Sequence, residues 1–343
     1  MNYFQNKIIL IIGATGTIGT KLVKELIAYS PKIIRIFSRD EYKQFEMQHS
    51  SMIISNNKKN IFRFLIGDVR DFERVDRAMK GVDIVFNLAA MKHVPFCEYN
   101  PDEAIKTNVV GMQNVIKAAI KNKVQCVLYT SSDKAINPTN TYGATKMLAE
   151  KLVQVVNFNS GYIDTKFIAV RFGNVMGSRG SVIPLFKKQI VERKSITITD
   201  LTMNRFMMTC SQAVKLMIKA CEVSKGGELF ILKMPVINLK DLAEVIIEET
   251  CKKLNIDHQK IKMDIIGHRP GERLYEELMT EEESKYSKDL GEMYVVPPST
   301  EQGLVSRYYK EYSDCILKSY ASIDEKAMDK EKLKNLLLEE GLL

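Results

Sequence analysis

Short apolar runs that alternate with helix-like segments are the feature that most restricts how this chain can fold. The runs have the length of strands and carry apolar residues on both faces, as strands buried inside a parallel sheet do. The segments between them are long enough to be helices that cross from one strand to the next. The runs span residues 8–12, 33–37, 61–66, 84–88, 124–130 and 167–170, and the helix-like segments span 21–29, 72–79, 105–121 and 142–157. The pattern predicts an α/β protein built on a doubly wound parallel sheet.

The alternation breaks into shorter pieces after residue 172. We expect a loop over 173–181, helices over 182–193, 211–222 and 239–253, strands over 196–199 and 228–232, and a solvated terminal helix in the charged tail from about 323. The predicted division is a cofactor-binding domain over 1–172 and, over 173–343, mainly a smaller mixed α/β lobe that binds substrate, followed by the tail. Some later segments are expected to rejoin the first domain.

Composition narrows the class of protein. The chain has 343 residues, 45% of them hydrophobic and 27% charged, which is typical of a globular protein. No apolar run reaches the ~18 residues that a membrane-spanning helix needs, so we expect a cytoplasmic protein without a membrane partner. The six cysteines and four histidines are scattered, without C-x-x-C spacing, so we expect neither a disulfide framework nor a metal site.

The net charge of +8 does not by itself indicate nucleic acid. Basic residues are interleaved with acidic ones, and no run of Lys and Arg exceeds two residues, as at Lys58-Lys59. We therefore expect no nucleic-acid partner, and we interpret the surplus as surface charge that favours a small anionic substrate.

A glycine-rich turn follows the first predicted strand and opens the first predicted helix. It reads Gly13-Ala14-Thr15-Gly16-Thr17-Ile18-Gly19, with the spacing G-x-x-G-x-x-G. Backbone N–H groups and a helix N-terminus at such a place can hold a pyrophosphate. The turn predicts a dinucleotide site, although the motif alone is a weak signal.

The ends of the next strands extend this site. Ser38 and Arg39 stand where a protein that prefers NAD would carry an acidic residue for the ribose diol, so they favour the 2′-phosphate of NADP; Arg39 could also be an ordinary loop cation. Asp68 and Val69 follow the third strand, where they could contact adenine. Leu88, Ala89 and Ala90 follow the fourth, where small residues allow a cofactor to pass or simply allow tight packing.

Tyr142 and Lys146 are spaced to share one face of a helix, where an ammonium can stabilise a phenolate. This makes Tyr142 a candidate general base, although a chain with 14 tyrosines will contain Tyr-x3-Lys by chance. Asp133 and Lys134 lie just upstream, and they are either catalytic or a structural ion pair at a strand-to-helix turn. An Asp that acts as an acid needs a raised pKa, which a neighbouring ammonium opposes unless Lys134 is neutral.

With these residues in place, the chain resembles the extended short-chain dehydrogenase/reductase family over nearly its whole length. The ordered matches are the glycine-rich turn, Asp68-Val69, Asn87-x-Ala89-Ala90, Asn108 with Gly111, and Tyr142-x3-Lys146. Four segments resemble the UDP-N-acetylglucosamine 4,6-dehydratases of pseudaminic acid and polysaccharide biosynthesis: 89–95, 132–146, Arg171-Phe172-Gly173-Asn174-Val175 and Arg269-Pro270-Gly271-Glu272. The resemblance implies a Rossmann-like sheet and an enzyme that uses NADP in preference to NAD.

The resemblance also implies roles for the residues of the 132–146 segment. Tyr142, assisted by Lys146, would take the proton of the sugar C4 hydroxyl, and NADP would accept and later return the hydride without being released. Lys134 would remove the C5 proton and Asp133 would help the C6 hydroxyl leave as water. Ser132, where the subfamily usually has Thr, would hydrogen-bond the C4 oxygen. The product would be a UDP-4-keto-6-deoxy-hexosamine.

Further contacts come from the same resemblance. Lys92 and Asn108 join the expected cofactor contacts together with Tyr142 and Lys146. The expected contacts with the UDP-sugar are Lys92, His93, Asn174, Arg205, Arg269 and Glu272. His93 is also readily explained as a packed turn residue, and Glu272 as an ion-pair partner of a neighbouring arginine.

Three alternatives remain open from the sequence. A UDP-sugar 4-epimerase needs Tyr142 and Lys146 but not the Asp133-Lys134 pair, and a 5-epimerase would act on the same scaffold. A protein that senses NADP(H) without turnover commonly lacks the Tyr or the Lys. By resemblance we expect a homo-oligomer, a dimer or a hexamer, formed through the helices over 105–121 and 142–157.

Overall fold

The structure is a computed structural model that describes residues 2–54, 59–159, 161, 163–267 and 274–343. Ten strands of this part of the chain form one sheet, in the order β16-β14-β15-β10-β6-β5-β4-β1-β2-β3. Every neighbouring pair from β3 to β10 is parallel, which confirms the predicted α/β architecture. The seven parallel strands are β1 (Ile8–Ile12), β2 (Ile33–Ser38), β3 (Phe62–Ile66), β4 (Ile84–Asn87), β5 (Cys126–Thr130), β6 (Lys166–Arg171) and β10 (Leu229–Leu232).

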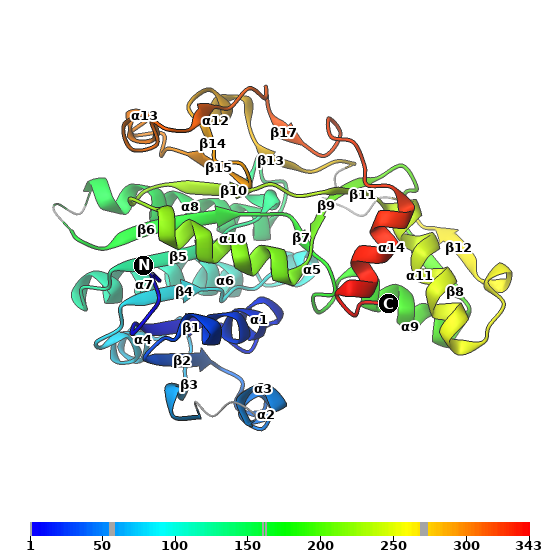
Figure 1. Cartoon of the computed structure of the whole chain (residues 1–343), viewed down its shortest axis with the longest axis horizontal. Helices are drawn as coiled ribbons and strands as arrows, with labels where there is room; N and C mark the ends of the chain where they lie inside the picture. The colour runs from blue at the N-terminus through cyan, green and yellow to red at the C-terminus, as the bar shows by residue number, and fades with distance from the viewer. Residues whose placement is uncertain (1, 55–58, 160, 162, 268–273) are drawn as a thin grey trace.

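Helices cover the sheet in two layers (Figure 1). Helix α1 (Thr17–Leu26) packs against α10 (Cys210–Val223), and α7 (Gly111–Lys121) packs between α4 (Phe72–Met79) and α8 (Thr141–Asn159). The strands carry apolar residues on both faces because each face lies under one of these layers. Residues such as Ile11, Phe86, Leu128 and Phe230 are fully buried there.

One predicted helix differs from the expectation. The segment expected over 105–121 begins earlier, as α6 (Pro101–Ile105), passes through a π-helical turn (Lys106–Val110) and continues as α7. A π-turn inserts an extra residue into a helix and is frequent at functional sites. Here it carries Asn108.

The chain returns to the sheet after residue 172. Besides β10, three short antiparallel strands extend the edge: β14 (Lys288–Asp289), β15 (Met293–Val296) and β16 (Ser313–Asp314). The division of the chain at residue 172 stays a prediction.

A second hydrophobic cluster lies beside the sheet, at the right of Figure 1. It is formed mainly by α9 (Val182–Arg193), β8 (Ser195–Ile198), α11 (Leu239–Leu254) and α14 (Lys330–Glu339). Strand β12 (Lys262–Ile265) pairs with β8 and is exposed. The expectation of a solvated terminal helix was wrong for one face of α14, because Leu333 and Leu337, four residues apart, are fully buried and α14 packs on α11. The charged residues around them hid this apolar stripe.

Two small sheets lie beside the main sheet. One consists of β7 (Asn174–Val175), β9 (Asn204–Met208) and β11 (Val236–Asn238), and the other pairs β13 (Glu277–Met279) with β17 (Tyr320–Ala321). Strand β13 contacts the turn over 133–135, which follows the carboxyl end of β5. The remaining helices are α2 (Glu41–Gln48), α3 (Ser51–Ile54), α5 (Val94–Tyr99), α12 (Glu281–Lys285) and α13 (Gly303–Tyr308).

The described residues lack two features. No helix there combines the length and the apolar character needed to cross a membrane. The same residues contain no group of three or more His, Cys, Asp or Glu side chains placed to bind a metal ion.

Candidate active site

The strand order reverses between β1 and β4, and a crevice at the carboxyl ends of strands on either side of such a point is where ligands bind in doubly wound sheets. The glycine-rich turn lies there. Gly13 has φ +84°, and a Cβ added to it would lie 3.0 Å from the backbone of Leu88 and Ala89. A Cβ on Gly19 would lie 2.5 Å from the Ala14 carbonyl oxygen. Only glycine allows the turn, the β4 loop and the start of α1 to approach this closely.

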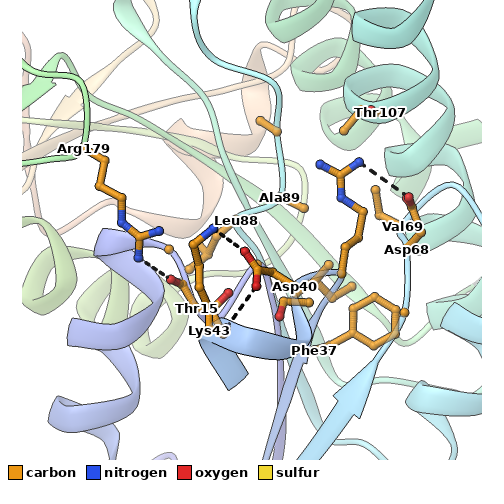
Figure 2. Close-up of a pocket in the computed structure, with 17 residues that line it drawn as sticks. Thr15, Phe37, Asp40, Lys43, Asp68, Val69, Leu88, Ala89, Thr107 and Arg179 are labelled. Atoms are coloured by element: carbon orange, nitrogen blue, oxygen red, sulfur yellow. Dashed lines mark hydrogen bonds and ion pairs between the residues drawn. The ribbon is translucent and has the colours of Figure 1, made fainter. Parts of the chain in front are cut away.

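A cavity of about 320 Å³ opens beside the turn (Figure 2). Ten residues expected to bind the cofactor line it: Gly13, Thr15, Gly16, Ser38, Arg39, Asp68, Val69, Leu88, Ala89 and Ala90. Thr17, Ile18 and Gly19 lie in the first turn of α1, next to the lining residues. A cleft walled by a glycine turn, a helix N-terminus and small side chains fits a dinucleotide cofactor.

The far end of the cavity carries charged residues that the sequence analysis did not single out. Asp40 caps α2 by accepting a hydrogen bond from the Lys43 backbone N–H at 3.0 Å, and its carboxylate also pairs with the Lys43 ammonium (Figure 2). These hydrogen bonds hold the pKa of Asp40 below its usual range. Arg39 Nη1 lies 3.6 Å from Asp68 Oδ2. Arg39 and Lys43 therefore both face this end, one and five residues after β2, and closeness to the end of the strand was the available sequence signal for Lys43.

Arg179 is a further lining residue that the sequence did not indicate. It comes from the loop before α9, and its Nη2 donates to the Thr15 carbonyl oxygen at 2.8 Å (Figure 2). Its backbone N–H lies 3.4 Å from Thr17 Oγ1. The loop thus closes over the glycine-rich turn, and a contact across more than 160 residues leaves no local pattern in the sequence.

Asn108 does not line the cavity and instead hydrogen-bonds residues near it. Its Oδ1 accepts from the Met91 backbone N–H at 2.8 Å, and its Nδ2 donates to Met91 O at 3.0 Å and to Thr145 Oγ1 at 2.9 Å. These bonds tie the loop after β4 to α8. A direct cofactor contact by Asn108 stays a prediction.

Tyr142 and Lys146 lie in the first two turns of α8 and are both buried. Lys146 Nζ donates to the Thr130 carbonyl oxygen at 2.7 Å and lies 4.7 Å from the centre of the Tyr129 ring. Burial lowers the pKa of Lys146 to about 7, against the opposing charge of Glu150. Burial raises the pKa of Tyr142 to about 12, while a hydrogen bond with Ser132 and the charge of Lys134 favour the phenolate.

Ser132, Asp133 and Lys134 form a short turn at the end of β5. Ser132 Oγ donates to Asp133 Oδ1 at 2.7 Å, and Lys134 Nζ donates to Asp133 Oδ2 at 2.8 Å. The Asp133 side chain is 4% exposed and that of Lys134 is 34% exposed. Desolvation would lower the pKa of Lys134, but the nearby Asp133 and Glu276 carboxylates outweigh it and raise that pKa. The five residues predicted to be catalytic are therefore brought together at one place.

Asn174 and Arg205, both expected to bind substrate, meet at Glu276, a residue that the sequence analysis missed. Asn174 Nδ2 lies 2.8 and 3.0 Å from the two carboxylate oxygens of Glu276, and Arg205 Nε lies 3.5 Å from Oε1. Arg205 Nη1 also donates to the Leu274 carbonyl oxygen at 2.9 Å. Glu276 was one acidic residue in a run of several, and no spacing rule distinguished it.

Lys92 and His93 lie in the loop after β4. The pKa of Lys92 is lowered by desolvation and by the positive charges of Arg179 and Lys134. The His93 ring packs on Gly180, where an added Cβ would lie 2.5 Å from Cε1. Arg269 and Glu272, the remaining expected substrate contacts, lie outside the described residues.

This arrangement is that of the extended short-chain dehydrogenases/reductases: a parallel sheet, a glycine-rich turn at its switch point and a Tyr/Lys helix beside it. Residues 9–298 match the model of a family described as polysaccharide biosynthesis protein, and the chain belongs to that family.

Curated relatives cover nearly the whole chain. An uncharacterised membrane protein of Methanocaldococcus jannaschii is 47% identical, over 98% of this chain and 97% of the relative. A UDP-glucose 4-epimerase of Rickettsia bellii is 41% identical, over 98% of this chain and 96% of the relative. An inverting UDP-N-acetylglucosamine 4,6-dehydratase of Campylobacter jejuni is 44% identical, over 86% of this chain and 84% of the relative. The family thus includes sugar-nucleotide dehydratases and epimerases.

Solved structures agree with the fold. Pen from Bacillus thuringiensis has a TM-score of 0.91 and 50% identity, over 99% of both chains. DesIV from Streptomyces venezuelae, a dTDP-glucose 4,6-dehydratase with NAD bound, has a TM-score of 0.64 at 19% identity, over 77% of this chain and 86% of that one, and shows the fold alone. The predicted membership and fold are confirmed.

Proposed function

We propose that this protein is a UDP-N-acetylglucosamine 4,6-dehydratase that uses NADP. The observation that carries the proposal is the buried Asp133 carboxylate, bonded on one side to Ser132 and on the other to Lys134, beside Tyr142. A 4-epimerase needs a base only at the C4 hydroxyl. A dehydratase also needs a base at C5 and an acid at C6, which is what a paired lysine and aspartate can supply.

Tyr142 acts first in this proposal, by taking the proton of the C4 hydroxyl. Its raised pKa reflects how strongly burial opposes the phenolate, so the charge of Lys134 and the Ser132 hydrogen bond are needed to favour it. The help of Lys146 is carried over from the resemblance alone. When bound, the cofactor supplies a hydride acceptor for C4 and a hydride donor for C6.

The elimination step requires Lys134 neutral and Asp133 protonated. Both conditions are met when one proton moves from Lys134 Nζ to Asp133 Oδ2 across their 2.8 Å hydrogen bond. When a substrate excludes water, the conversion of this ion pair into a neutral pair is favoured, because desolvation disfavours both charges. Lys134 then takes the C5 proton and Asp133 gives its proton to the departing C6 hydroxyl, which leaves as water.

The site also offers a way to reset these protons. After the reaction Tyr142 holds the proton from the C4 hydroxyl and Asp133 has lost one. Ser132 is hydrogen-bonded to both, so its hydroxyl can pass a proton from the phenol to the carboxylate. Lys134 gives one of its three ammonium protons, which exchange with solvent, to C5 of the sugar, and the groups regain their starting state.

Charges on the described residues favour an anionic substrate and NADP. The positive charges of Arg179 and Lys134 act on Lys92, and such a group of cations suits the diphosphate of a UDP-sugar. Arg39 and Lys43 stand at the end of the cavity where a 2′-phosphate would lie, with Asp40 engaged by Lys43. By resemblance, Asn174, Arg205, Arg269 and Glu272 complete the sugar-nucleotide site, and the protein acts as a homo-oligomer.

The second candidate is a UDP-sugar 4-epimerase, because relatives with that name match 98% of the chain. A 5-epimerase and a non-catalytic NADP(H) sensor are weaker candidates, since the first needs no Asp133 acid and the second needs no Tyr142 base.

The test is proton NMR of the purified protein with UDP-N-acetylglucosamine and a catalytic amount of NADP⁺. The dehydratase produces a new C6 methyl doublet without net reduction of the cofactor. Signals of a C4 epimer without a methyl doublet would support the epimerase instead. An unchanged sugar despite tight NADP binding would support the sensor.

A further inference from the structure

Glu276 is a buried carboxylate in the candidate active site, and the proposed dehydratase steps do not use it. It is 8% exposed and lies just before β13. Its Oε2 accepts a hydrogen bond from the Phe206 backbone N–H at 2.9 Å, and both oxygens accept from Asn174 Nδ2. A carboxylate with so many donors is held in one orientation.

The backbone of Glu276 is held as firmly as its side chain. Its N–H donates to Ser322 Oγ at 3.0 Å, and its carbonyl oxygen accepts from the Ser322 N–H at 2.8 Å. Ser322 is fully buried and follows β17. The β13–β17 pair therefore fixes this residue against the catalytic turn.

Lys134 lies between two carboxylates. Its Nζ is 2.8 Å from Asp133 Oδ2 and 4.0 Å from Glu276 Oε1. Any charge on Glu276 therefore acts directly on the proton that Lys134 and Asp133 share.

We propose that Glu276 is a positioning residue that controls whether Lys134 is charged. Ionised Glu276 stabilises the Lys134 ammonium and holds the pair in its charged form. Neutral Glu276 removes that stabilisation, so the proton moves from Lys134 Nζ to Asp133 Oδ2 and leaves a free amine and a carboxylic acid. The inference rests on the proposed dehydratase function and concerns only its elimination step.

The groups around Glu276 bring its pKa close to neutral pH. Burial, with the Asp133 charge adding to it, raises the pKa of Glu276 to about 7, against Lys134, Arg205 and the hydrogen bond from Asn174. The other charged or titratable groups near the pair are Tyr142, which acts on Lys134, and Lys92. Glu276 is thus neutral below about pH 7 and ionised above it, and we expect elimination to slow as pH rises through that value.

The experiment compares the pH profiles of two steps in the wild-type protein and in Glu276→Gln, both saturated with NADP⁺. Oxidation at C4 is followed by the transient absorbance of reduced nicotinamide, and elimination by loss of deuterium from UDP-N-acetylglucosamine labelled at C5. In the wild type, we expect the loss of label to slow by about tenfold between about pH 6 and about pH 8.5. In Glu276→Gln that decline should be absent. The profile of C4 oxidation should keep its shape, because the proton shift removes the Lys134 and Asp133 charges together and these act on Tyr142 in opposite directions.

Further variants keep the outcome interpretable. Glu282→Gln removes an exposed carboxylate from α12 and should retain the wild-type profile. Arg205→Gln removes the cation 3.5 Å from Glu276, so the pKa of Glu276 and the decline in elimination should both move to higher pH, even if Glu276→Gln fails to fold. Melting temperatures and NADP binding identify variants that have lost the fold.

The outcomes separate this inference from the proposed function. A wild-type protein that forms no methyl product and loses no C5 label overturns the proposed function. A wild-type protein that does both, with the same decline in Glu276→Gln and no movement in Arg205→Gln, overturns the role of Glu276 alone.

Discussion

Gly143 and the Lys134 carbonyl oxygen are so close that a Cβ on Gly143 would lie 2.1 Å from that oxygen. The start of α8, which carries Tyr142, is therefore pressed against the turn that carries Asp133 and Lys134. The missing side chain sets the distance between the two halves of the proposed catalytic group.

Gly143→Ala should separate these two elements. A side chain cannot fit without moving α8 or the turn, and displacements of about 1 Å at a reacting group cost up to ~100-fold in rate. We expect turnover to fall by about tenfold to hundredfold while NADP binding is kept, measured by steady-state kinetics and cofactor titration. Gly303→Ala is the matched control, because its Cβ meets only a glutamate side chain, at 3.8 Å. Unchanged turnover in Gly143→Ala would contradict the close approach.

Tyr142→Phe should remove the base for the C4 hydroxyl. General-base catalysis typically contributes about 10²–10⁴-fold, so a loss of that order is expected in the single-turnover rate of C4 oxidation. Tyr129→Phe provides the comparison, because the buried Tyr129 hydroxyl has no hydrogen-bond partner among the described residues. That variant should retain most of the activity, and equal losses in both variants would argue against a special role for Tyr142.

Replacing both Arg39 and Lys43 by Ala should weaken NADP binding more than NAD binding. Hydrogen bonds to charged groups contribute about 1.5–3 kcal/mol, so a loss of roughly tenfold to hundredfold in NADP affinity is expected. Isothermal titration with each cofactor measures it, and Arg77→Ala, on α4 outside the cavity, is the control. If the affinities for both cofactors fell equally, the double variant would have damaged the pocket rather than a 2′-phosphate site.

Lys146 should make stability depend on pH in a predictable direction. Its folded-state pKa of about 7 lies below the ordinary value of 10.5, so between these values the unfolded chain binds more protons and stability rises with pH. Relative to Lys146→Met, the wild-type free energy of unfolding should increase by about 2–3 kcal/mol from pH 7 to pH 9, as measured by urea denaturation. Lys151→Met, at an exposed position on the same helix, is the control and should show no such trend. A difference between wild type and Lys146→Met that stays constant with pH would mean that Lys146 is charged when folded.

Much of the fold was predictable from local patterns. Helix α4 and strand β1 were expected over the residues they occupy. In each, the apolar residues follow the spacing of a single kind of secondary structure, and polar residues on both sides mark where that structure begins and ends. The antiparallel strands β14, β15 and β16 were not predicted. Two of them are two residues long, and they exist because the edge of a completed sheet offers them hydrogen-bond partners.

The sequence by itself determined the parallel strands, the glycine-rich turn and the candidate residues from 132 to 146, since each depends on residues that are neighbours along the chain. Only the tertiary structure decided that Glu276 lies 4.0 Å from Lys134 and that Arg179 reaches Thr15. The physical reason is that these contacts join segments more than a hundred residues apart. They form only when the order of the strands and the packing of the smaller sheets have placed their backbones side by side.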